Sequence, residues 1–207
     1  MQKTVIVNAH VISPDVDVEN ATIVIEGARI KSVKAGKAAA KADRNTTVVD
    51  VKGQYVMPGF IDVHTHGALG YDFCDADPKA IFEFAKAKLQ EGVTTVLPTT
   101  LTVSHEELIV AAGNAKKYAE AGQPYAKVPG IHLEGPFINV KCCGAQNPKH
   151  VRKPSVKELK EIAKVYPVRQ ISYAVETEGG AKFAKDCFRL GVVPSCGHTG
   201  AKFADLE

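Results

Sequence analysis

The chain has 207 residues, of which 45% are hydrophobic and 24% are charged, and its formal net charge is +3. This is the composition of a globular protein with enough residues for one sizeable core and a small accessory domain. Because Lys and Arg are spread along the sequence without a basic block, we expect no nucleic-acid or membrane partner, and the sequence contains no apolar run long enough to span a bilayer.

Cysteine usage and the amino terminus bear on the cellular compartment. The sequence holds five cysteines, an odd number that does not make a disulfide framework. Two of them, Cys142 and Cys143, are adjacent and lack metal-finger spacing, so we expect reduced thiols. Residues 1–7 lead directly into a strand pattern and lack the features of a signal peptide. These observations predict a cytoplasmic protein.

Residues 1–57 have a β-strand pattern. Three regions rich in Val, Ile and Thr, at residues 3–12, 21–33 and 46–56, are separated by turn residues. An Ala- and Lys-rich stretch at residues 35–42 is predicted to be a loop. We expect this segment to form a small β-sandwich portion attached to the following domain.

From residue 58 onward, strand and helix patterns alternate. Short β-branched runs predict strands at residues 60–66, 93–98, 126–133, 169–175 and 192–196. Capping residues and apolar periodicity predict helices at residues 78–90, 104–121, 155–166 and 180–190, with a further helix beginning near residue 204. This alternation predicts a parallel sheet with helical crossovers.

The five βα units leave two α/β architectures open. One is an open five-stranded sheet, and the other is a (β/α)8 TIM-type barrel, which needs eight such units. An apparent helix begins in the last residues of the sequence, which favours the barrel. Residues 58–207 would then form an incomplete (β/α) barrel.

Two histidines follow the first strand of this region. His64 and His66 come after the apolar run at residues 60–63, which has the pattern of a buried parallel strand. Because side chains alternate along a strand, both imidazoles are expected on one side, which suits a metal site. The alternative is a hydrogen-bonded histidine pair without a metal.

Polar residues also follow the third and fifth strands. Active sites of parallel α/β proteins form at the carboxyl ends of strands, so Glu134 and His198 are expected to meet the histidine pair. Imidazole and carboxylate donors predict a divalent metal, with Zn first and Fe, Mn or Co as alternatives. A catalytic metal of this kind activates water for hydrolysis. The structural alternatives are a Glu134 paired with a surface lysine and a His198 packed in the core.

The remaining histidines are weaker candidates. His132 shares a strand face with Glu134, so it either orients the metal ligands or is a buried structural histidine. His10, His105 and His150 are expected at the surface. The run Gly197-His198-Thr199-Gly200 superficially suggests a phosphate loop, but it lacks the lysine and the full spacing of one.

Three motifs are similar to a known family. Pro58–Gly67, with the sequence PGFIDVHTHG, resembles the opening signature of the amidohydrolase superfamily. His132–Phe137 (HLEGPF) and Gly197–Ala201 (GHTGA) resemble the N-acetylglucosamine-6-phosphate deacetylases within it, and their spacing fits as well. The resemblance implies hydrolysis of the acetamide of N-acetylglucosamine 6-phosphate to glucosamine 6-phosphate and acetate, a step of amino-sugar catabolism, on a (β/α)8 barrel.

The resemblance also implies roles for individual residues. Glu134 and His198 match two ligands of the main metal of that family, and His64 and His66 match a pair that can hold a second ion. One or two metal ions are therefore implied.

The loop after the third strand is the implied substrate contact. Ala145 and Gln146 fall in the part of this loop that contacts the sugar. Many relatives have His where this sequence has Gln146, and Gln can still donate a hydrogen bond to the acetamide carbonyl oxygen.

Other family residues have no counterpart in the sequence. A further metal-binding His, the catalytic Asp and the phosphate-binding residues lie outside residues 1–207, so no catalytic residue is assigned within this range. We therefore expect the chain to be the amino-terminal part of a longer protein and to be inactive alone. The resemblance also implies a homodimer in which the partner helps to close the site for the sugar phosphate.

Two alternatives remain open. One is another amidohydrolase that acts on a cyclic amide or a nucleobase, although such relatives often place a carboxylated lysine after the fourth strand and residues 169–175 contain no lysine. The other is a non-catalytic module that binds a metal or a sugar phosphate.

Overall fold

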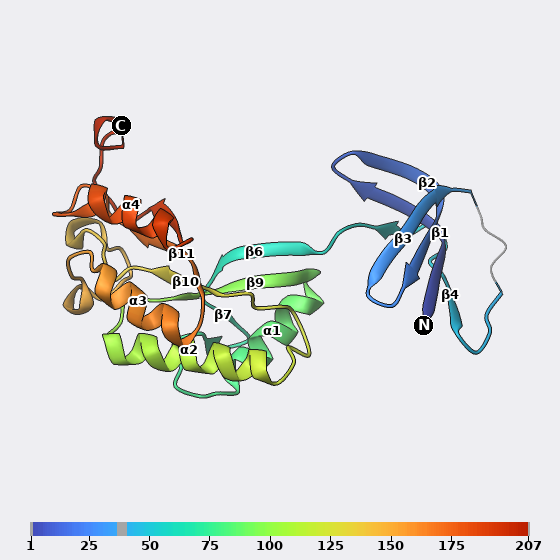
Figure 1. Ribbon diagram of the computed structural model, residues 1–207, viewed down its shortest axis with the longest axis horizontal. Coiled ribbons are helices and arrows are strands. Elements are labelled where there is room, and N and C mark those ends of the chain that lie inside the picture. The colour runs from blue at the N-terminus through green and yellow to red at the C-terminus, as the bar shows by residue number, and fades with distance from the viewer. Residues whose placement is uncertain (1, 37–40, 207) are drawn as a thin grey trace. The chain divides into compact units, whose positions relative to one another are not determined.

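The structure is a computed structural model that describes residues 2–36 and 41–206. It contains two compact units, Met1–Pro58 and Gly59–Glu207 (Figure 1). The loop predicted at residues 35–42 lies partly outside the described residues, because 37–40 are not among them. Among the helices of the described residues, none has the length and apolar character needed to cross a membrane.

The first unit contains a single five-stranded sheet among its described residues. Its strands are β1 (Lys3–Ser13), β2 (Val16–Glu26), β3 (Arg29–Ala35), β4 (Thr46–Asp50) and β5 (Tyr55–Val56). The order is β3-β2-β1-β4, and β5 also pairs with β1. The neighbours β1, β2 and β3 are antiparallel, whereas β4 and β5 run parallel to β1. The sandwich predicted for this segment stays a prediction.

The second unit is built on a five-stranded parallel sheet. Its strands are β6 (Phe60–Thr65), β9 (Val93–Thr100), β10 (Ile131–Glu134), β11 (Val168–Tyr173) and β12 (Val193–Cys196). Their order is β12-β11-β10-β9-β6, so each strand lies beside its predecessor in this unit. A short antiparallel ribbon, β7 (Gly67–Ala68) with β8 (Tyr71–Asp72), follows β6. The predicted parallel α/β sheet is confirmed.

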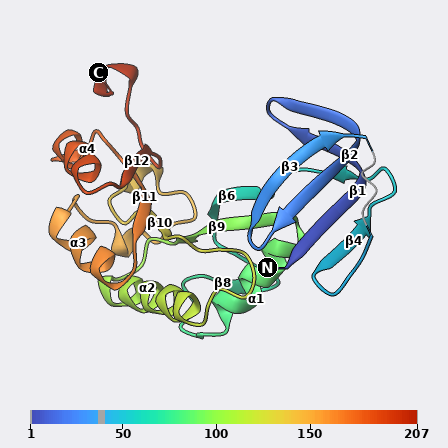
Figure 2. The same cartoon turned by 45° about the vertical axis from the view of Figure 1, so that its right-hand side comes forward.

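Helices connect these strands. They are α1 (Ala80–Gln90), α2 (His105–Glu120), α3 (Val156–Val165) and α4 (Gly180–Arg189), and short 3-10 turns occur at η1 (Val140–Cys142), η2 (Pro148–His150) and η3 (Phe203–Asp205). Figure 2 shows the four helices following one another along the sheet, and consecutive helices are in contact. Their buried side chains and those of the strands form one core, whose largest members include Tyr118, Phe84, Phe137, Leu108 and Ile162.

Helix starts agree with the capping signals to different degrees. Ser104 and Glu107 form a complete capping box at the start of α2, as predicted. At α3, Ser155 accepts from the backbone N–H of Glu158, but the carboxylate of Glu158 binds Arg152 instead of completing the box. The helix predicted from residue 78 begins at Ala80, and the helix predicted near residue 204 is the 3-10 turn η3.

Two strand predictions are corrected. The third strand was expected at residues 126–133 but is Ile131–Glu134, because Lys127 makes only an isolated bridge with Thr95. The run at residues 60–63 was expected to be buried, yet Phe60 is 57% exposed and Ile61 is 68% exposed. These side chains are exposed because β6 lies at the edge of the sheet and, among the described strands, pairs with β9 alone.

Candidate metal centre

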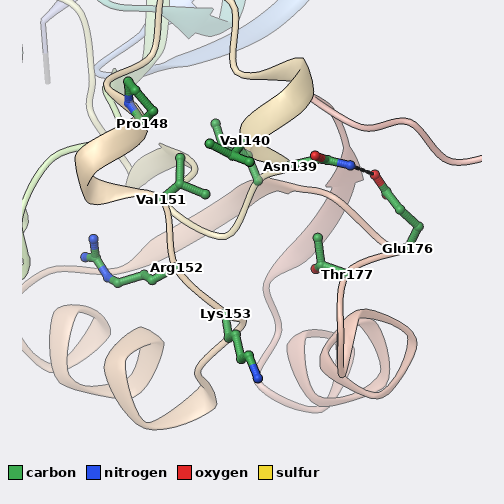
Figure 3. Close-up of a pocket in the computed structure, with 9 residues that line it drawn as sticks. Asn139, Val140, Pro148, Val151, Arg152, Lys153, Glu176 and Thr177 are labelled. Atoms are coloured by element: carbon green, nitrogen blue, oxygen red, sulfur yellow. Dashed lines mark hydrogen bonds between the residues drawn. The ribbon is translucent and has the colours of Figure 1, made fainter.

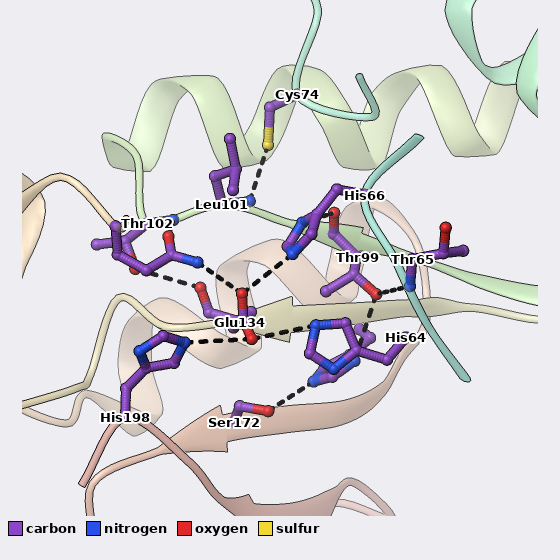
Figure 4. A network of polar contacts seen from close by, with 12 residues as sticks. His64, Thr65, His66, Cys74, Thr99, Leu101, Thr102, Glu134, Ser172 and His198 are labelled. Atoms are coloured by element: carbon purple, nitrogen blue, oxygen red, sulfur yellow. Dashed lines mark hydrogen bonds and ion pairs between the residues drawn. The ribbon is translucent and has the colours of Figure 1, made fainter. Parts of the chain in front are cut away.

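Three imidazoles, those of His64, His66 and His198, meet around the carboxylate of Glu134 in the second unit (Figure 4). Oε1 of Glu134 lies 3.1 Å from Nε2 of His64 and 3.3 Å from Nε2 of His198. Oε2 of Glu134 lies 3.1 Å from Nε2 of His66. The site therefore combines the end of β10 with residues at or just beyond the ends of β6 and β12, as expected for a parallel α/β protein.

Local geometry explains why the pair on β6 faces the carboxylate. His64 and His66 are two positions apart at the end of an extended strand, so their side chains lie on the same side. The chain then turns away through Gly67, where a Cβ atom would lie 1.9 Å from the carbonyl oxygen of Tyr71. Glycine at this position lets the β7–β8 ribbon approach the end of β6 closely.

Hydrogen bonds fix the orientation of two of the imidazoles. Nδ1 of His66 lies 3.1 Å from the carbonyl oxygen of Thr99, and Nδ1 of His198 lies 3.0 Å from that of Cys142. A carbonyl oxygen only accepts, so Nδ1 carries the proton in both rings and Nε2 has the free lone pair in the neutral form. Backbone carbonyls orient metal-binding histidines in this way.

The donor set fits a divalent cation. Neutral His66 and His198 direct nitrogen lone pairs at the oxygens of Glu134, and this arrangement of acceptors is favourable only with a cation between them, either a proton or a metal. One potential ligand atom from each of His64, His66 and Glu134 lies within 4.8 Å of the other two. Imidazole nitrogen and carboxylate oxygen are donors that zinc and the neighbouring transition metals accept.

The site keeps its carboxylate ionised. Burial raises the pKa of Glu134, but a hydrogen bond from the protonated ring of His66 and the nearby imidazoles of His64 and His198 outweigh it and lower the pKa to about 2. The hydrogen bond with Glu134 also raises the pKa of His66. The centre therefore offers a negative charge to a cation at neutral pH.

Gln146 contacts the same carboxylate. This residue is 6% exposed, and its Nε2 donates to Oε2 of Glu134 at 2.5 Å. Its Oε1 accepts from the backbone N–H of Thr102 at 2.6 Å, which sets the orientation of the amide. Ala145, the other residue expected to contact substrate, is exposed on the loop between β10 and α3.

His132 lies on the same strand as Glu134 and is fully buried. Its Nδ1 donates to the carbonyl oxygen of Val63 at 3.0 Å, so its Nε2 accepts from the hydroxyl of Ser172 at 2.8 Å. Burial lowers the pKa of His132 to about 4, which keeps the ring neutral. His132 therefore links three strands, β6, β10 and β11, just below the carboxylate.

Several residues of the site were missed by sequence reasoning. Thr99, Thr102 and Ser172 hold His66, Gln146 and His132 respectively. Their only signal in the sequence is that they lie at or just beyond the carboxyl ends of β9 and β11, where functional residues gather in such sheets. Of the three histidines expected at the surface, His105 is close to Glu158 and Glu161.

Comparison with known proteins decides the family. The sequence model of the Amidohydrolase family matches residues 55–178, which is more than half of the chain. The chain belongs to the amidohydrolase family. The match includes β6, β9, β10 and β11, and therefore Glu134 with His64 and His66 but not His198. The family resemblance predicted from the three motifs is confirmed.

Individual amidohydrolases resemble the chain over most of its length. An N-acetylglucosamine-6-phosphate deacetylase of Lysinibacillus sphaericus is 29% identical over 157 residues, covering 75% of this chain and 41% of that protein. An N-acetylgalactosamine-6-phosphate deacetylase of Escherichia coli is 30% identical over 157 residues, covering 75% and 42%. The chain thus spans about two fifths of the length of the curated relatives it matches.

A solved structure extends the similarity to the fold. A mutant N-acetyl-D-glucosamine-6-phosphate deacetylase of Mycobacterium smegmatis, in complex with N-acetyl-D-glucosamine-6-phosphate, matches with a TM-score of 0.85 at 26% identity. The alignment covers 99% of this chain and 52% of that one. The folds of the two units thus have counterparts in a single amidohydrolase chain.

Proposed function

We propose that this chain is part of a metal-dependent hydrolase that cleaves the acetamide of N-acetylglucosamine 6-phosphate into glucosamine 6-phosphate and acetate. The observation that carries the proposal is the carboxylate of Glu134, which has imidazole Nε2 atoms at 3.1 and 3.3 Å on Oε1 and at 3.1 Å on Oε2. Two of these rings are oriented by backbone carbonyls, as in metal-binding histidines. The similarity to deacetylases of phosphorylated amino sugars supports the choice of reaction.

The proposed cofactor is a divalent metal, Zn before Fe, Mn or Co, present as one or two ions. Glu134 and His198 would hold the main ion, and His64 and His66 would hold a second. When bound, such a metal supplies Lewis acidity toward a carbonyl oxygen and toward water. The negative charge of Glu134 and the fixed rings of His66 and His198 support this assignment.

The neighbouring residues have roles that do not depend on the number of ions. The amide nitrogen of Gln146 has two N–H groups, and with one bound to Glu134 the other can donate to the acetamide oxygen of the substrate. Ala145 lies beside it and would contact the sugar. His132 stays neutral and holds the end of β6 through Val63, so it keeps the pair of histidines on that strand in place.

We extend the proposal to the whole molecule. Residues 58–207 would form the first part of a (β/α)8 barrel, and residues 1–57 would contribute to a β-sandwich. The complete protein would be a cytoplasmic homodimer that binds a small sugar phosphate and neither nucleic acid nor membrane. The match to one relative over 99% of this chain supports the fold in this proposal.

The decisive experiment measures acetate release by zinc-reconstituted protein that contains this chain in full. N-acetylglucosamine 6-phosphate is compared with N-acetylgalactosamine 6-phosphate, because relatives of the chain carry either name. We expect turnover of the glucosamine derivative that is lost in Glu134→Gln and retained in His10→Ala, whose histidine lies in the first unit. Absence of turnover with zinc bound would contradict the deacetylase proposal.

One other amide remains a second candidate. Hydrolysis of a cyclic amide is less well supported, because the position paired with Glu134 on β11 is Ser172, which cannot serve as a carboxylated lysine. Zinc binding without turnover of any amide would instead support a metal- or sugar-phosphate-binding module.

A further inference from the structure

A carboxylate outside the metal centre joins three loops of the second unit. Glu176 lies in the loop after β11, and its Oε1 accepts from Nδ2 of Asn139 and from the backbone N–H of Gly200, both at 2.7 Å. Its Oε2 accepts from the hydroxyl of Thr199. Figure 3 shows the bond between Asn139 and Glu176. Because Asn139 follows β10 and Thr199 follows β12, one side chain connects the loops beyond three neighbouring strands.

The same loops hold the candidate ligand His198. Its backbone carbonyl accepts from the N–H of Asn139 at 3.0 Å, and its Nδ1 donates to the carbonyl of Cys142 at 3.0 Å. The backbone φ of His198 is +50°, in the left-handed region that residues other than glycine seldom occupy. The surrounding hydrogen bonds must hold this conformation against the intrinsic preference of the residue.

Glu176 fixes both sides of this arrangement. The Oδ1 of Asn139 accepts from the N–H of Lys141 at 2.9 Å, so the side-chain amide is oriented with its Nδ2 toward Glu176. On the other side, Thr199 directly follows His198 in the chain. Glu176 therefore restrains the residue that binds the carbonyl of His198 and the residue that comes after it.

The carboxylate of Glu176 is engaged by the protein itself. Burial raises its pKa, but the hydrogen bonds from Asn139, Thr199 and Gly200 outweigh this and lower the pKa to about 2. Ionised acceptors make stronger hydrogen bonds than neutral ones. Glu176 also borders a pocket of about 460 Å³, shown in Figure 3, but both of its oxygens already accept from the chain. The carboxylate therefore stabilises the loops, and we do not assign it to a ligand in that pocket.

We propose that Glu176 is a positioning residue that keeps His198 in its metal-binding orientation by tying together the loops after β10, β11 and β12. The inference rests on the proposed metal centre, since His198 acts there as a ligand. Glu176 itself contacts the neighbours of His198 rather than the imidazole.

Three variants test this role. Glu176→Leu removes the acceptor oxygens, whereas Glu176→Gln keeps one for Asn139 and Gly200 and removes the charge. Glu158→Leu is the matched control, because Glu158 is also a partly buried carboxylate that accepts several hydrogen bonds, but their donor is Arg152, in the loop before α3. All three are compared with the unsubstituted protein.

Zinc affinity is the first readout, measured by calorimetry on metal-free protein beside the absorption spectrum of cobalt-substituted protein. Glu176→Leu is expected to lower zinc affinity by about ten-fold or more and to change the cobalt spectrum, because residues behind metal ligands typically contribute that much. The zinc affinity of Glu176→Gln should lie between those of Glu176→Leu and the unsubstituted protein. Glu158→Leu should lose thermal stability while binding zinc normally. Normal zinc affinity in Glu176→Leu would overturn the proposal, and if that variant does not fold, normal affinity in Glu176→Gln would do so.

Amide hydrogen exchange is the second readout and needs no metal. The N–H of Gly200 bonds to Glu176 and that of Asn139 bonds to His198, so both should exchange faster in Glu176→Leu but not in Glu158→Leu. If the unsubstituted protein binds no zinc, the metal centre fails, and exchange alone then decides the role of Glu176. Unchanged amide exchange at Gly200 and Asn139 in Glu176→Leu would overturn the proposed positioning role of Glu176.

Discussion

The side-chain amide of Gln146 donates to Oε2 of Glu134 across 2.5 Å, so a neutral group helps to orient the carboxylate at the centre of the site. The oxygen of the same amide accepts from the backbone N–H of Thr102. Gln146 is thus placed between the backbone beyond β9 and the end of β10, and the position of the carboxylate depends on a loop residue as well as on its own strand.

Substitution of Gln146 by Leu should lower the free energy of unfolding. The change leaves the N–H of Thr102 without its acceptor and removes one of the two groups that contact Oε2 of Glu134, and an unsatisfied buried polar group costs about 1–3 kcal/mol. We expect the free energy of unfolding of the metal-free protein, measured by urea denaturation, to fall by about that amount, with a parallel loss of acetate release. The exposed neighbour Lys149→Ala should change stability by no more than about 0.5 kcal/mol. Equal stability of the two variants would contradict the assigned contacts.

His132 and Ser172 allow a differential test of the support behind the ligands. His132→Phe removes the donor to the carbonyl of Val63, whereas Ser172→Ala removes only the partner of the other ring nitrogen. We expect hydrogen exchange in β6 to accelerate in His132→Phe and to stay unchanged in Ser172→Ala, with a loss of zinc affinity in the first variant alone. Similar exchange of β6 in both variants would show that His132 does not hold this strand.

Two adjacent cations should differ sharply in their contribution to stability. The guanidinium of Arg152 donates to Glu158 and to the carbonyls of Val103 and His150, whereas Lys153 forms an exposed pair with Glu178. Lysine cannot reproduce the planar fork of arginine. We expect Arg152→Lys to lower the free energy of unfolding by about 2 kcal/mol, in line with hydrogen bonds to charged groups, and Lys153→Ala to lower it by less than about 1 kcal/mol. Urea denaturation of both variants provides the measurement.

Acid denaturation should depend on Glu176. The pKa of this group is lowered from 4.5 to about 2 in the folded protein, so the folded state favours the ionised form. The stability that it contributes is fully present above pH 4.5 and is lost as the pH falls toward 2. Glu176→Gln should therefore be less stable than the unsubstituted protein at pH 7, and the difference should shrink across this window. A constant difference from pH 7 to pH 2, measured by urea denaturation at each pH, would contradict the assignment.

Metal removal should lower thermal stability through the candidate centre. A ligand that binds only the folded state stabilises it by about 2.7 kcal/mol at a hundred times its Kd. We expect a chelator to lower the Tm, zinc to restore it, and Glu134→Gln to lose most of this response. A zinc-dependent rise in Tm of normal size in Glu134→Gln would place the metal elsewhere.

The sequence is informative about the site because the chemistry follows the alternation of strands and helices. His64, His66, Glu134 and His198 lie at or just beyond strand ends, and a parallel sheet brings such ends to one edge. The histidines meet around the carboxylate of Glu134 because of the order of the strands. Short apolar runs and helix caps in the sequence are sufficient to predict this order. The capping box of Ser104 is equally local and equally predictable.

Features that depend on distant partners were not predictable in the same way. Glu176 lies 37 residues from Asn139 and 24 from Gly200, and no periodic pattern marks a carboxylate that joins loops. The exposure of Ile61 depends on how many strands flank β6, which a β-branched run does not reveal. The bond from Gln146 to Glu134 likewise depends on the course of a loop.

Because β6 lies at the edge of the sheet, a bound metal would also stabilise the attachment of this strand. His64 and His66 belong to the outermost strand, whereas Glu134 lies on β10, with β9 between them. The pairing of β6 with β9 is irregular between Asp62 and Thr65, just where the ligands begin. Metal bound between the histidines of β6 and the carboxylate on β10, as one ion or two, would connect these strands across β9, so its loss would loosen β6 first and let unfolding start at this edge.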